Sequence, residues 1–455
     1  MHMDLGKYKI VKDPVHGYIR IYEHELSIID VFAYQRLRKI KQLSVADFVY
    51  PGATHTRFSH SLGVAHVIEA LVRDVMRKYR VGRSDLKRYI VMMRLLAILH
   101  DIGHGPYSHS FEEFVLFSRG VTHEDMGAKI VLQESQVASA IERIASEYGY
   151  KLSDVATALK CENRDCWPFK ESIYDAGSEK ALFYMLKGAY SADIIDYLLR
   201  DSYYTGARYG GNIDWQRISY YLGIRGDDVV IDYRALDAVE LLMLTRVYMF
   251  STVYYHKTVR AANRFLGNIM QIIQDRKIID FDGAIKDVSE YIKLNDESIL
   301  YNPAVFSLEE VRDFLSRKIP YKVVAEHRIP LSNTKNAVEL VENMDKGKSV
   351  IETILEEKAR GRGIEIEKNK HFFIDTPKLS LNPMLGSEDV MVMFEGGQIT
   401  KKSIFDFTWF NIPRFAVLIR LYVRRELKEK AAILRDIFNE ILNLEEIKSA
   451  IEQQR

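Results

Sequence analysis

The chain has 455 residues, of which 47% are hydrophobic and 28% charged, and its formal net charge is +1. This composition is typical of a globular protein large enough for more than one core, and the balanced charge gives no overall reason to expect a nucleic-acid or membrane-surface partner. The opening segment is charged rather than a secretory signal, and no apolar run reaches membrane-spanning length, so we expect a cytoplasmic protein.

The sequence contains two cysteines, Cys161 and Cys166. They cannot complete a thiolate zinc site by themselves, because such a site takes four ligands. A disulfide between them is possible, but this cysteine usage suits a reducing compartment, and a large core does not require a crosslink. We therefore expect no disulfide.

The first two thirds of the chain predict a mainly helical lobe. Residues 9–21 predict a β-hairpin, because Asp-Pro and His-Gly pairs between its two runs are turn residues. Helical periodicity or helix boundary signals follow at 28–43, 61–80, 86–99, 124–147, 179–201 and 236–275, with a short strand at 228–233.

The composition changes near residue 330. Short β-branched and aromatic runs at 372–375, 390–394 and 399–404, separated by Gly-Gly and Asn-Pro turn signals, predict strands. A closing helix is predicted from Pro413 to the end, with a basic, solvated face at 420–430. We expect two domains, residues 1–330 and 331–455, and a mainly α fold in which a helical core is followed by a smaller α+β lobe.

Histidines are concentrated in one part of the sequence, where six of the thirteen fall between residues 55 and 109. An apolar run typical of a buried helix ends in the pair His100-Asp101. His60 stands at a predicted helix start, and Asp193 lies on a later predicted helix. A lone histidine is more often an ordinary core or surface residue, but two imidazoles with two carboxylates suit Mn, Fe, Zn, Co or Ni. The pattern therefore favours a divalent transition-metal site with positions open for water and a phosphate oxygen.

These residues belong to longer motifs, KIVKDPVHGYI, QRLRKIKQL, TRFSHSLGV, LHDIGHGPYSH and DYLLRDS. Their H…HD…D order and wording resemble the HD-domain metal-dependent phosphohydrolases, in particular the branch containing the SAM-and-HD-domain deoxynucleoside triphosphate triphosphohydrolase and its prokaryotic relatives. The similarity covers residues 7–325, without a counterpart of the SAM domain. It implies an HD-domain helical core and hydrolysis of deoxynucleoside triphosphates to deoxynucleoside and inorganic triphosphate. The implied metal ligands are His60, His100, Asp101 and Asp193.

The resemblance also implies a group that handles the proton of the reaction. A histidine matching His109 protonates the leaving oxygen, and Glu112, one helical turn on, supports it where the family has Asp. His104 and the pair His123-Glu124 match residues that orient the phosphate and the acid. The alternative for His123-Glu124 is an ordinary helix start on the surface.

Further matches imply contacts with the substrate. Two arginines correspond to phosphate-binding residues, three residues to those that recognise the sugar 3′-hydroxyl, and two to those that crowd the 2′ position. In that order they are Arg57 and Arg246; Gln42, Tyr197 and Asp201; and Leu43 and Tyr254. Without the resemblance, Leu43 and Tyr254 would be assigned to the helical core, and most arginines are simply solvated.

One position departs from the family, because Ile194 follows Asp193 where a basic residue usually contacts the outer phosphates. Either another cation replaces it, such as Lys257, Arg246 or Mg²⁺ bound to the triphosphate, or the substrate carries fewer phosphates. Two alternatives therefore stay open. One is a metal-dependent phosphohydrolase acting on a nucleoside monophosphate or cyclic nucleotide; the other is a nucleotide-sensing or nucleic-acid-binding protein, which the basic stretches 83–88 and 420–430 allow.

Family members are oligomers that bind activating nucleotides at subunit interfaces. The resemblance implies a homo-oligomer, dimer or tetramer, with an activator such as dGTP or GTP. The matching allosteric positions are Lys9, Ile10, Asp30, Gln35, Arg38 and Arg317, whereas Lys12 stands where the family often has Asn. The alternative for the basic members is a solvated helix face.

Overall fold

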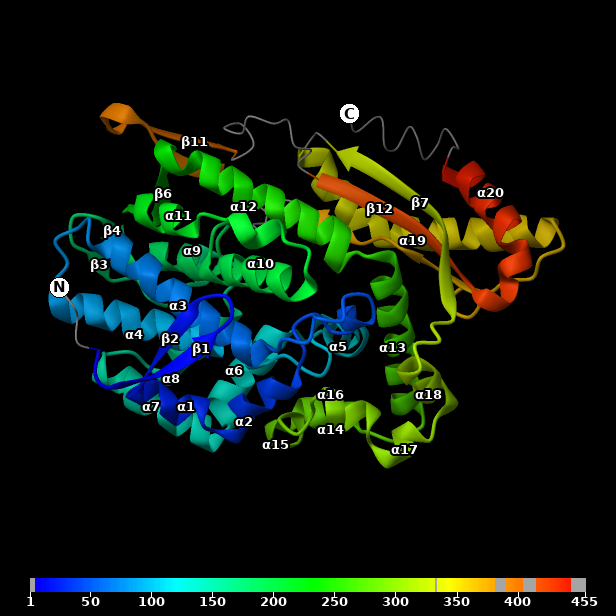
Figure 1. Cartoon of the computed structure of the whole chain (residues 1–455), viewed down its shortest axis with the longest axis horizontal. Helices are drawn as coiled ribbons and strands as arrows, with labels where there is room; N and C mark the ends of the chain where they lie inside the picture. Colours follow the sequence, from blue (N-terminus) through cyan, green and yellow to red (C-terminus); the bar gives the residue numbers. More distant parts are fainter. Residues whose placement is uncertain (1–4, 332–333, 381–388, 404–414, 443–455) are drawn as a thin grey trace.

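The computed structural model describes residues 5–331, 334–380, 389–403 and 415–442, and it is mainly helical with small sheets (Figure 1). This confirms the expected fold class, a helical core with a smaller α+β region. The apolar faces of the helices before residue 320 share one continuous core. Those helices are α1 (Glu23–Ile29), α2 (Phe32–Gln35), α3 (Arg57–Met76), α4 (Arg83–Leu99), α5 (His109–Phe111), α6 (His123–Gln133), α7 (Ser135–Glu147), α8 (Leu152–Lys160), α9 (Leu182–Lys187), α10 (Ala192–Thr205), α11 (Trp215–Tyr221), α12 (Leu236–Met249), α13 (Lys257–Asp275), α14 (Phe281–Lys286), α15 (Val288–Tyr291), α16 (Asp296–Leu300), α17 (Pro303–Phe306) and α18 (Glu309–Leu315).

Helices α3, α4 and α10 form the part of the core that carries the predicted site. Helix α3 packs against both of the others. Every residue of α4 from Tyr89 to Leu99 is buried, including Arg94, which is paired with Glu25 at 2.6 Å and with Glu69 at 2.9 Å. A helix that is buried on all sides is held by its neighbours, and pairing satisfies the charge inside it. The end of α4 is therefore held in place by the core, and the residues that follow Leu99 start from this rigid position.

Four of the predicted helices are interrupted in the structure. The helix predicted at 28–43 is broken at Asp30 and Val31, and the one at 124–147 is broken at Glu134. The helix predicted at 179–201 is broken at the extended Gly188, and the one at 236–275 by a π-helical turn at Phe250–Tyr254. At Glu134 the backbone is extended and the side chain accepts a hydrogen bond from the N–H of Val137, which starts the next helix. Apolar periodicity continues across such breaks because both halves face the same core, so periodicity alone does not reveal them.

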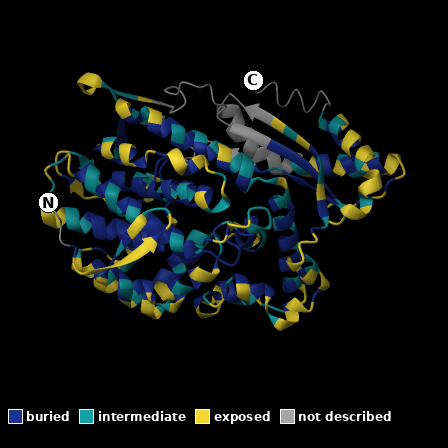
Figure 2. Ribbon diagram, in the orientation of Figure 1, coloured by how far each residue is buried: buried dark blue, intermediate teal, exposed yellow. Residues whose placement is uncertain are grey.

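The predicted β-hairpin is present as β1 (Tyr8–Asp13) and β2 (Gly17–Tyr22), paired antiparallel. Its turn is held by Asp13, whose Oδ1 accepts the N–H groups of Val15 and His16 at 2.9 Å each. The outer strand β1 is exposed along most of its length, as Figure 2 shows, whereas β2 buries Ile19, Ile21 and Tyr22 against the helices. The hairpin therefore lies flat on the helical body.

The expected strands near residues 230, 391 and 401 are confirmed and belong to one sheet. Its order is β11 (Ile399–Ser403), β10 (Asp389–Met393), β6 (Asp228–Asp232) and β5 (Leu222–Arg225). Strand β10 runs parallel to β6, so the sheet combines strands from both sides of residue 330. A separate two-stranded sheet joins β3 (Ser172–Ile173) to β4 (Gly177–Ser178).

A second four-stranded sheet forms the centre of the C-terminal region. Strand β12 (Phe415–Arg424) lies between β7 (Tyr321–Leu331) and the pair β8 (Phe372–Asp375) and β9 (Lys378–Ser380). Helices α19 (Thr334–Gly361) and α20 (Ala431–Leu442) cover it, and their residues Leu355 and Phe438 share a buried cluster with Leu421 (Figure 1). The boundary predicted at residue 330 falls within β7, and the division into two domains stays a prediction.

The closing helix predicted from Pro413 is wrong for its first part, because residues 415–424 form β12; residues 413–414 and 443–455 lie outside the described part of the chain. Residues 418–423 are buried, and Arg420 within them is paired with Glu326 at 2.8 Å. A central strand that is buried on both faces has a continuous apolar run, which does not distinguish it from a buried helix. The basic face predicted at 420–430 is therefore split between this strand and the exposed 3-10 turns at Arg425–Lys430.

The expectation of no disulfide is also wrong, because Cys161 is bonded to Cys166. A 3-10 turn at Arg164–Cys166 brings the two Cα atoms to 5.6 Å. Among the described residues, no helix has both the length and the apolar character needed to cross a membrane.

Candidate active site

The four predicted metal ligands converge from three segments. His60 lies in the first turn of α3, His100 and Asp101 follow the end of α4, and Asp193 lies in the first turn of α10, which Ser191 caps. His60 Nε2 lies 3.0 Å from Asp193 Oδ1, 3.3 Å from His100 Nε2 and 3.6 Å from Asp101 Oδ2. His100 Nε2 is 3.4 Å from Asp101 Oδ1. His60, His100 and Asp193 thus form one compact group of donors, and Asp101 adjoins it through both histidines while also grouping with His104 and His123.

The electrostatics of this quartet fit a divalent cation. Burial lowers the pKa of His60, but hydrogen bonds with Asp193 and Asp196 outweigh it and raise that pKa to about 10. Burial raises the pKa of Asp101, yet Arg57 and the neighbouring histidines hold it well below its usual range. At neutral pH Asp101 is therefore charged and His60 carries a proton, which a divalent cation would displace on binding. A mixed N/O donor set of this kind suits Mn, Fe, Co, Ni or Zn.

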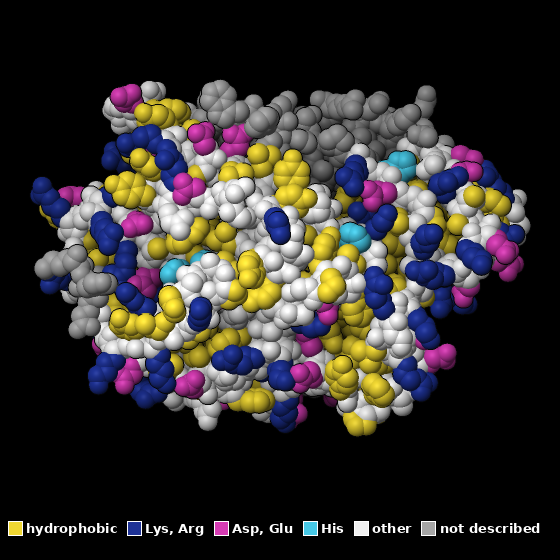
Figure 3. Space-filling view, viewed as in Figure 1, with side chains coloured by type: hydrophobic (Ala, Val, Ile, Leu, Met, Phe, Trp, Pro, Cys, Tyr) yellow, Lys and Arg dark blue, Asp and Glu magenta, His cyan; other side chains and the backbone are white. Residues whose placement is uncertain are grey.

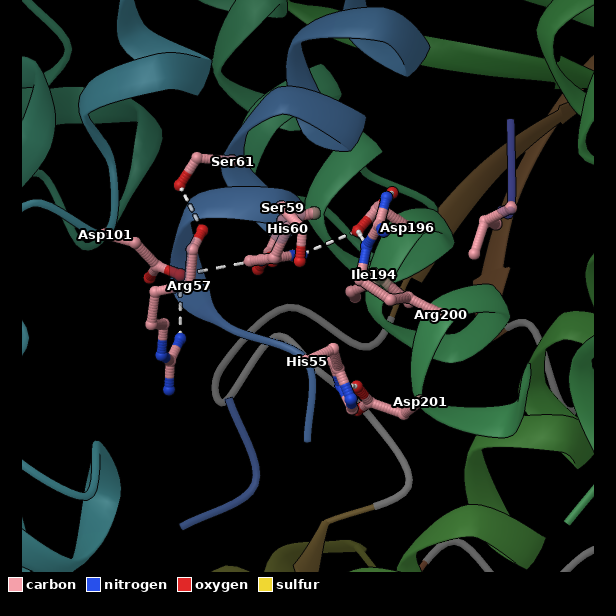
Figure 4. A network of polar contacts seen from close by, with 12 residues as sticks. His55, Arg57, Ser59, His60, Ser61, Asp101, Ile194, Asp196, Arg200 and Asp201 are labelled. Atoms are coloured by element: carbon pink, nitrogen blue, oxygen red, sulfur yellow. Dashed lines mark hydrogen bonds and ion pairs between the residues drawn. The ribbon is translucent and has the colours of Figure 1, made fainter. Parts of the chain in front are cut away.

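The second ring nitrogen of each ligand histidine is also engaged, as metal-binding histidines require. His60 Nδ1 lies 2.7 Å from Asp196 Oδ2, and His100 Nδ1 donates to the carbonyl of Ala97 at 2.7 Å. Figure 4 shows His60 turned toward Asp196. Both rings are therefore oriented with Nε2 toward the other donors.

The predicted proton-transfer group lies beside this quartet. One oxygen of Glu112 is 2.9 Å from His109 Nδ1 and the other is 2.6 Å from His123 Nδ1. His104 joins the two halves, since its Nε2 is 3.3 Å from Asp101 Oδ1 and its ring stacks on that of His123 at 3.8 Å. Burial lowers the pKa of His123, but Glu112 reverses this and raises it. The longer side chain of Glu thus contacts two histidines at once.

His109 is the most exposed member of this group, with 68% of its side chain accessible. Tyr107 and Ser108 precede it with φ values of 59° and 54°, a backbone region that non-glycine residues rarely adopt. The side chain of Ser108 is held by Arg57 Nε at 2.9 Å and donates to the carbonyl of Lys41 at 2.6 Å. The chain therefore turns sharply just before His109. Glu124, the remaining predicted member of the group, has its Oε2 atom 3.3 Å from His123 Nδ1.

Three of the residues predicted to bind substrate have buried polar atoms without a hydrogen-bond partner in the described part of the protein. They are Arg57 Nη2, Arg246 Nε and Nη1, and Gln42 Oε1. Leaving a buried polar group unpaired costs about 1–3 kcal/mol, so each of these atoms is open to a bound ligand. Arg57 keeps its other end fixed by pairing with Asp101 at 2.8 Å. These atoms match the phosphate and sugar contacts that the resemblance implies.

The residues predicted to recognise the sugar form a second polar group. Asp201 accepts a hydrogen bond from Tyr254 Oη at 2.7 Å, and its other oxygen is 2.7 Å from His55 Nε2. The ring centroids of Tyr197 and Tyr254 are 6.3 Å apart, and Leu43 is half-buried against the core. His55 was not assigned from the sequence, although it is one of the clustered histidines.

Ile194 is buried with 5% exposure and belongs to the core cluster. Its side chain lies among the buried apolar residues of α10, and the exposed Lys257 stands at the start of α13. The residue that follows Asp193 in the sequence is therefore apolar and buried rather than basic.

The predicted allosteric residues lie in four separate segments. Lys9 and Ile10 are exposed on β1, Asp30 is exposed after α1, and Arg317 donates to the carbonyl of Phe48 at 2.8 Å. Gln35 and Arg38 contact each other, since Arg38 Nε donates to Gln35 Oε1 at 2.8 Å. This is the one pair of the six that a described hydrogen bond joins.

Comparison with known proteins decides the family. The HD-domain profile matches residues 57–170, and the HD-associated region matches residues 213–300. The chain is 30% identical over 336 residues to the protein YwfO of Bacillus subtilis, covering 69% of this chain and 72% of that protein. The chain belongs to the HD-domain phosphohydrolases.

Other relatives carry a named activity. The chain is 29% identical to deoxynucleoside triphosphate triphosphohydrolase SAMHD1 of Gallus gallus over 70% of its length, and it spans 56% of that protein. Among solved structures, a hypothetical protein from Aquifex aeolicus matches with a TM-score of 0.68 at 26% identity, covering 94% of this chain and 100% of that one. A phosphohydrolase from Bacteroides thetaiotaomicron matches in fold with a TM-score of 0.66 at 23% identity, covering 92% and 100%.

Proposed function

We propose that the protein hydrolyses deoxynucleoside triphosphates to deoxynucleoside and inorganic triphosphate with a divalent transition metal. The observation that carries this is the link made by His104, which contacts the ligand Asp101 and stacks on His123 of the proton-transfer group. The candidate metal ligands and the exposed imidazole of His109 thereby belong to one connected group of side chains. The name of the SAMHD1 relatives supports the substrate class.

In this proposal His60, His100, Asp101 and Asp193 hold the metal, which supplies Lewis-acid polarisation of the phosphate and activation of water when bound. Arg57 binds a phosphate oxygen through its free Nη2 while Asp101 and Ser108 fix the rest of its guanidinium. His109 donates a proton to the departing 5′-oxygen, and Glu112, 2.9 Å from His109 Nδ1, orients the ring.

At the other end of the substrate, Gln42 and Asp201 bind the sugar 3′-hydroxyl. The hydrogen bond from Tyr254 to Asp201 fixes the tyrosine ring, and with Leu43 that ring occupies the space beside the 2′ carbon. A ribose hydroxyl would then meet carbon rather than a hydrogen-bond partner. The arrangement therefore predicts a preference for deoxyribose.

The test is incubation of purified protein with each dNTP and Mn²⁺, with and without dGTP as activator, followed by chromatography of the products. The expected products are deoxynucleoside and inorganic triphosphate in equal amounts. His109→Gln is the control for contaminating hydrolases. Absence of both products under every combination would remove the proposal.

A second candidate is favoured by Ile194, whose burial leaves the position next to Asp193 without a cation. A substrate with one phosphate, such as a nucleoside monophosphate or a cyclic nucleotide, would not need that charge. Orthophosphate or a monophosphate as the first product, with dNTPs unchanged, would support this candidate. A nucleic-acid-binding role is not favoured, since Lys and Arg are interspersed with Asp and Glu on the face shown in Figure 3.

Regulation is proposed along the same lines. A homo-oligomer with an activating dGTP or GTP at its interface would use the exposed Lys9, Ile10, Asp30, Arg38 and Arg317, together with Gln35. Sizing of the protein with and without dGTP tests this. A larger species that forms only with dGTP, and activity that rises with it, are the expected results.

A further inference from the structure

A chain of buried polar contacts connects the turn of the β1–β2 hairpin to the histidine at the metal site. Asp196 lies at its centre, on α10 one turn after Asp193, and its side chain is completely buried. Its Oδ2 is 2.7 Å from His60 Nδ1, and its Oδ1 is 2.6 Å from Nε2 of His16. His16 lies in the hairpin turn, and only 2% of its side chain is exposed. One carboxylate therefore contacts a histidine of the metal site and a histidine of the hairpin.

Arg200 makes a second connection between the same two places. It donates to both oxygens of Asp196 at 2.9 Å each, and its Nη1 donates to Asp13 Oδ2 at 2.8 Å. The other oxygen of Asp13 holds the turn by accepting the N–H of His16. The hairpin turn is thus tied to α10 twice, through His16 and through Asp13, and both ties end on the carboxylate that orients His60.

The backbone of α3 is shaped to admit this group. Gly63 stands one turn after His60, and a Cβ atom at that position would lie 1.8 Å from Asp196 Oδ1 and 2.4 Å from Arg200 Nη2. Such separations are far below contact distance, so any larger residue would displace the carboxylate or the guanidinium. The close approach of α10 to α3 is therefore built around these side chains.

We propose that Asp196 and His16 are positioning residues for the metal site, and that through them the β1–β2 hairpin controls how tightly the metal is held. Asp196 accepts the Nδ1–H of His60, which fixes the tautomer that leaves Nε2 free as a ligand. His16 and Arg200 fix Asp196 in turn. Displacement of the hairpin turn would loosen Asp196 and, with it, the orientation of His60. The proposal rests on the assignment of His60 as a metal ligand, and it is independent of the substrate.

The test measures Mn²⁺ binding to metal-free protein by competition with a fluorescent chelator, for wild type, His16→Gln and Asp196→Asn. Replacing a residue that orients a ligand typically weakens metal affinity by about 10–100-fold, so a loss of at least about 10-fold is expected for Asp196→Asn and a smaller one for His16→Gln. His66→Gln is the matched control, because its ring lies 5.0 Å from that of His16 in the same aromatic group. Its affinity should stay within about twofold of wild type.

Hydrogen exchange supplies a readout that a merely structural role would not change. Mn²⁺ should slow amide exchange in residues 8–22 of wild type and His66→Gln, and this protection should be lost in His16→Gln. Circular dichroism of the metal-free proteins establishes which variants are folded; if Asp196→Asn is not, His16→Gln alone decides. A folded His16→Gln with wild-type Mn²⁺ affinity and full hairpin protection would overturn the proposal. If wild type binds no Mn²⁺, the ligand assignment fails instead, whereas loss of dNTP turnover alone would leave the proposal intact.

Discussion

Substituting Gly63 by alanine tests the packing on which the site depends. Alanine is favoured over glycine inside a helix by about 1 kcal/mol. Here, however, the added methyl group would lie 1.8 Å from Asp196 Oδ1, so the buried pair of Asp196 and Arg200 must separate or shift. Breaking such a pair costs about 3–5 kcal/mol. The difference predicts a net loss of about 2–4 kcal/mol in the free energy of unfolding.

The assay is thermal unfolding of the metal-free protein followed by circular dichroism, with Gly127→Ala as the matched control. Gly127 also lies in a helix, α6, but the nearest atom to its added Cβ would be 3.6 Å away, an ordinary contact. Gly63→Ala should lower the midpoint by about 2–4 °C on the size scaling for a chain of this length, whereas Gly127→Ala should leave it unchanged or raise it. A Gly63→Ala protein as stable as wild type would refute the close approach of α10 to α3.

Three further outcomes follow from the site. His109→Gln should lower kcat for dNTP hydrolysis by about 10²–10⁴-fold with little change in KM, because it removes a proton donor rather than a binding contact; an unchanged kcat would exclude His109 as the acid. Tyr254→Ala should raise kcat/KM for GTP relative to dGTP by about tenfold or more, since it opens the space beside the 2′ carbon, and an unaltered ratio would contradict that role. Burial raises the pKa of Asp296 to about 7. The contribution of its protonated form to the free energy of unfolding is therefore fully present below about pH 4, and it is lost as the pH rises through 7. The unfolding midpoint of wild type should accordingly fall relative to that of Asp296→Asn between pH 5 and about 8, and parallel curves would argue against a raised pKa.

The helical body and the position of His100-Asp101 could be predicted because their signals are local. His100-Asp101 ends an apolar run, and that run is the buried helix α4. The hairpin turn is specified by Asp13 within a few residues of itself. The order of the motifs then placed Asp193 with the other three, although a long stretch of sequence separates them.

Other features depend on tertiary contacts that the sequence does not display. Strand β12 is apolar on both faces because β7 and β8 flank it and helices cover the sheet, so its pattern equally fits a helix. His16 was explained as turn chemistry, and its contact with Asp196 spans 180 residues. His55 and Asp201 are likewise brought together only by the fold. Positioning residues of this kind have no local periodicity to reveal them.

The central claim is that His60, His100, Asp101 and Asp193 together hold one divalent ion beside His109. The most direct measurement is Mn²⁺ stoichiometry and affinity by calorimetry for wild type and Asp193→Ala, with circular dichroism to show that both are folded. Our account predicts one high-affinity ion per chain in wild type and its loss in Asp193→Ala. Equal binding by the folded variant would contradict it.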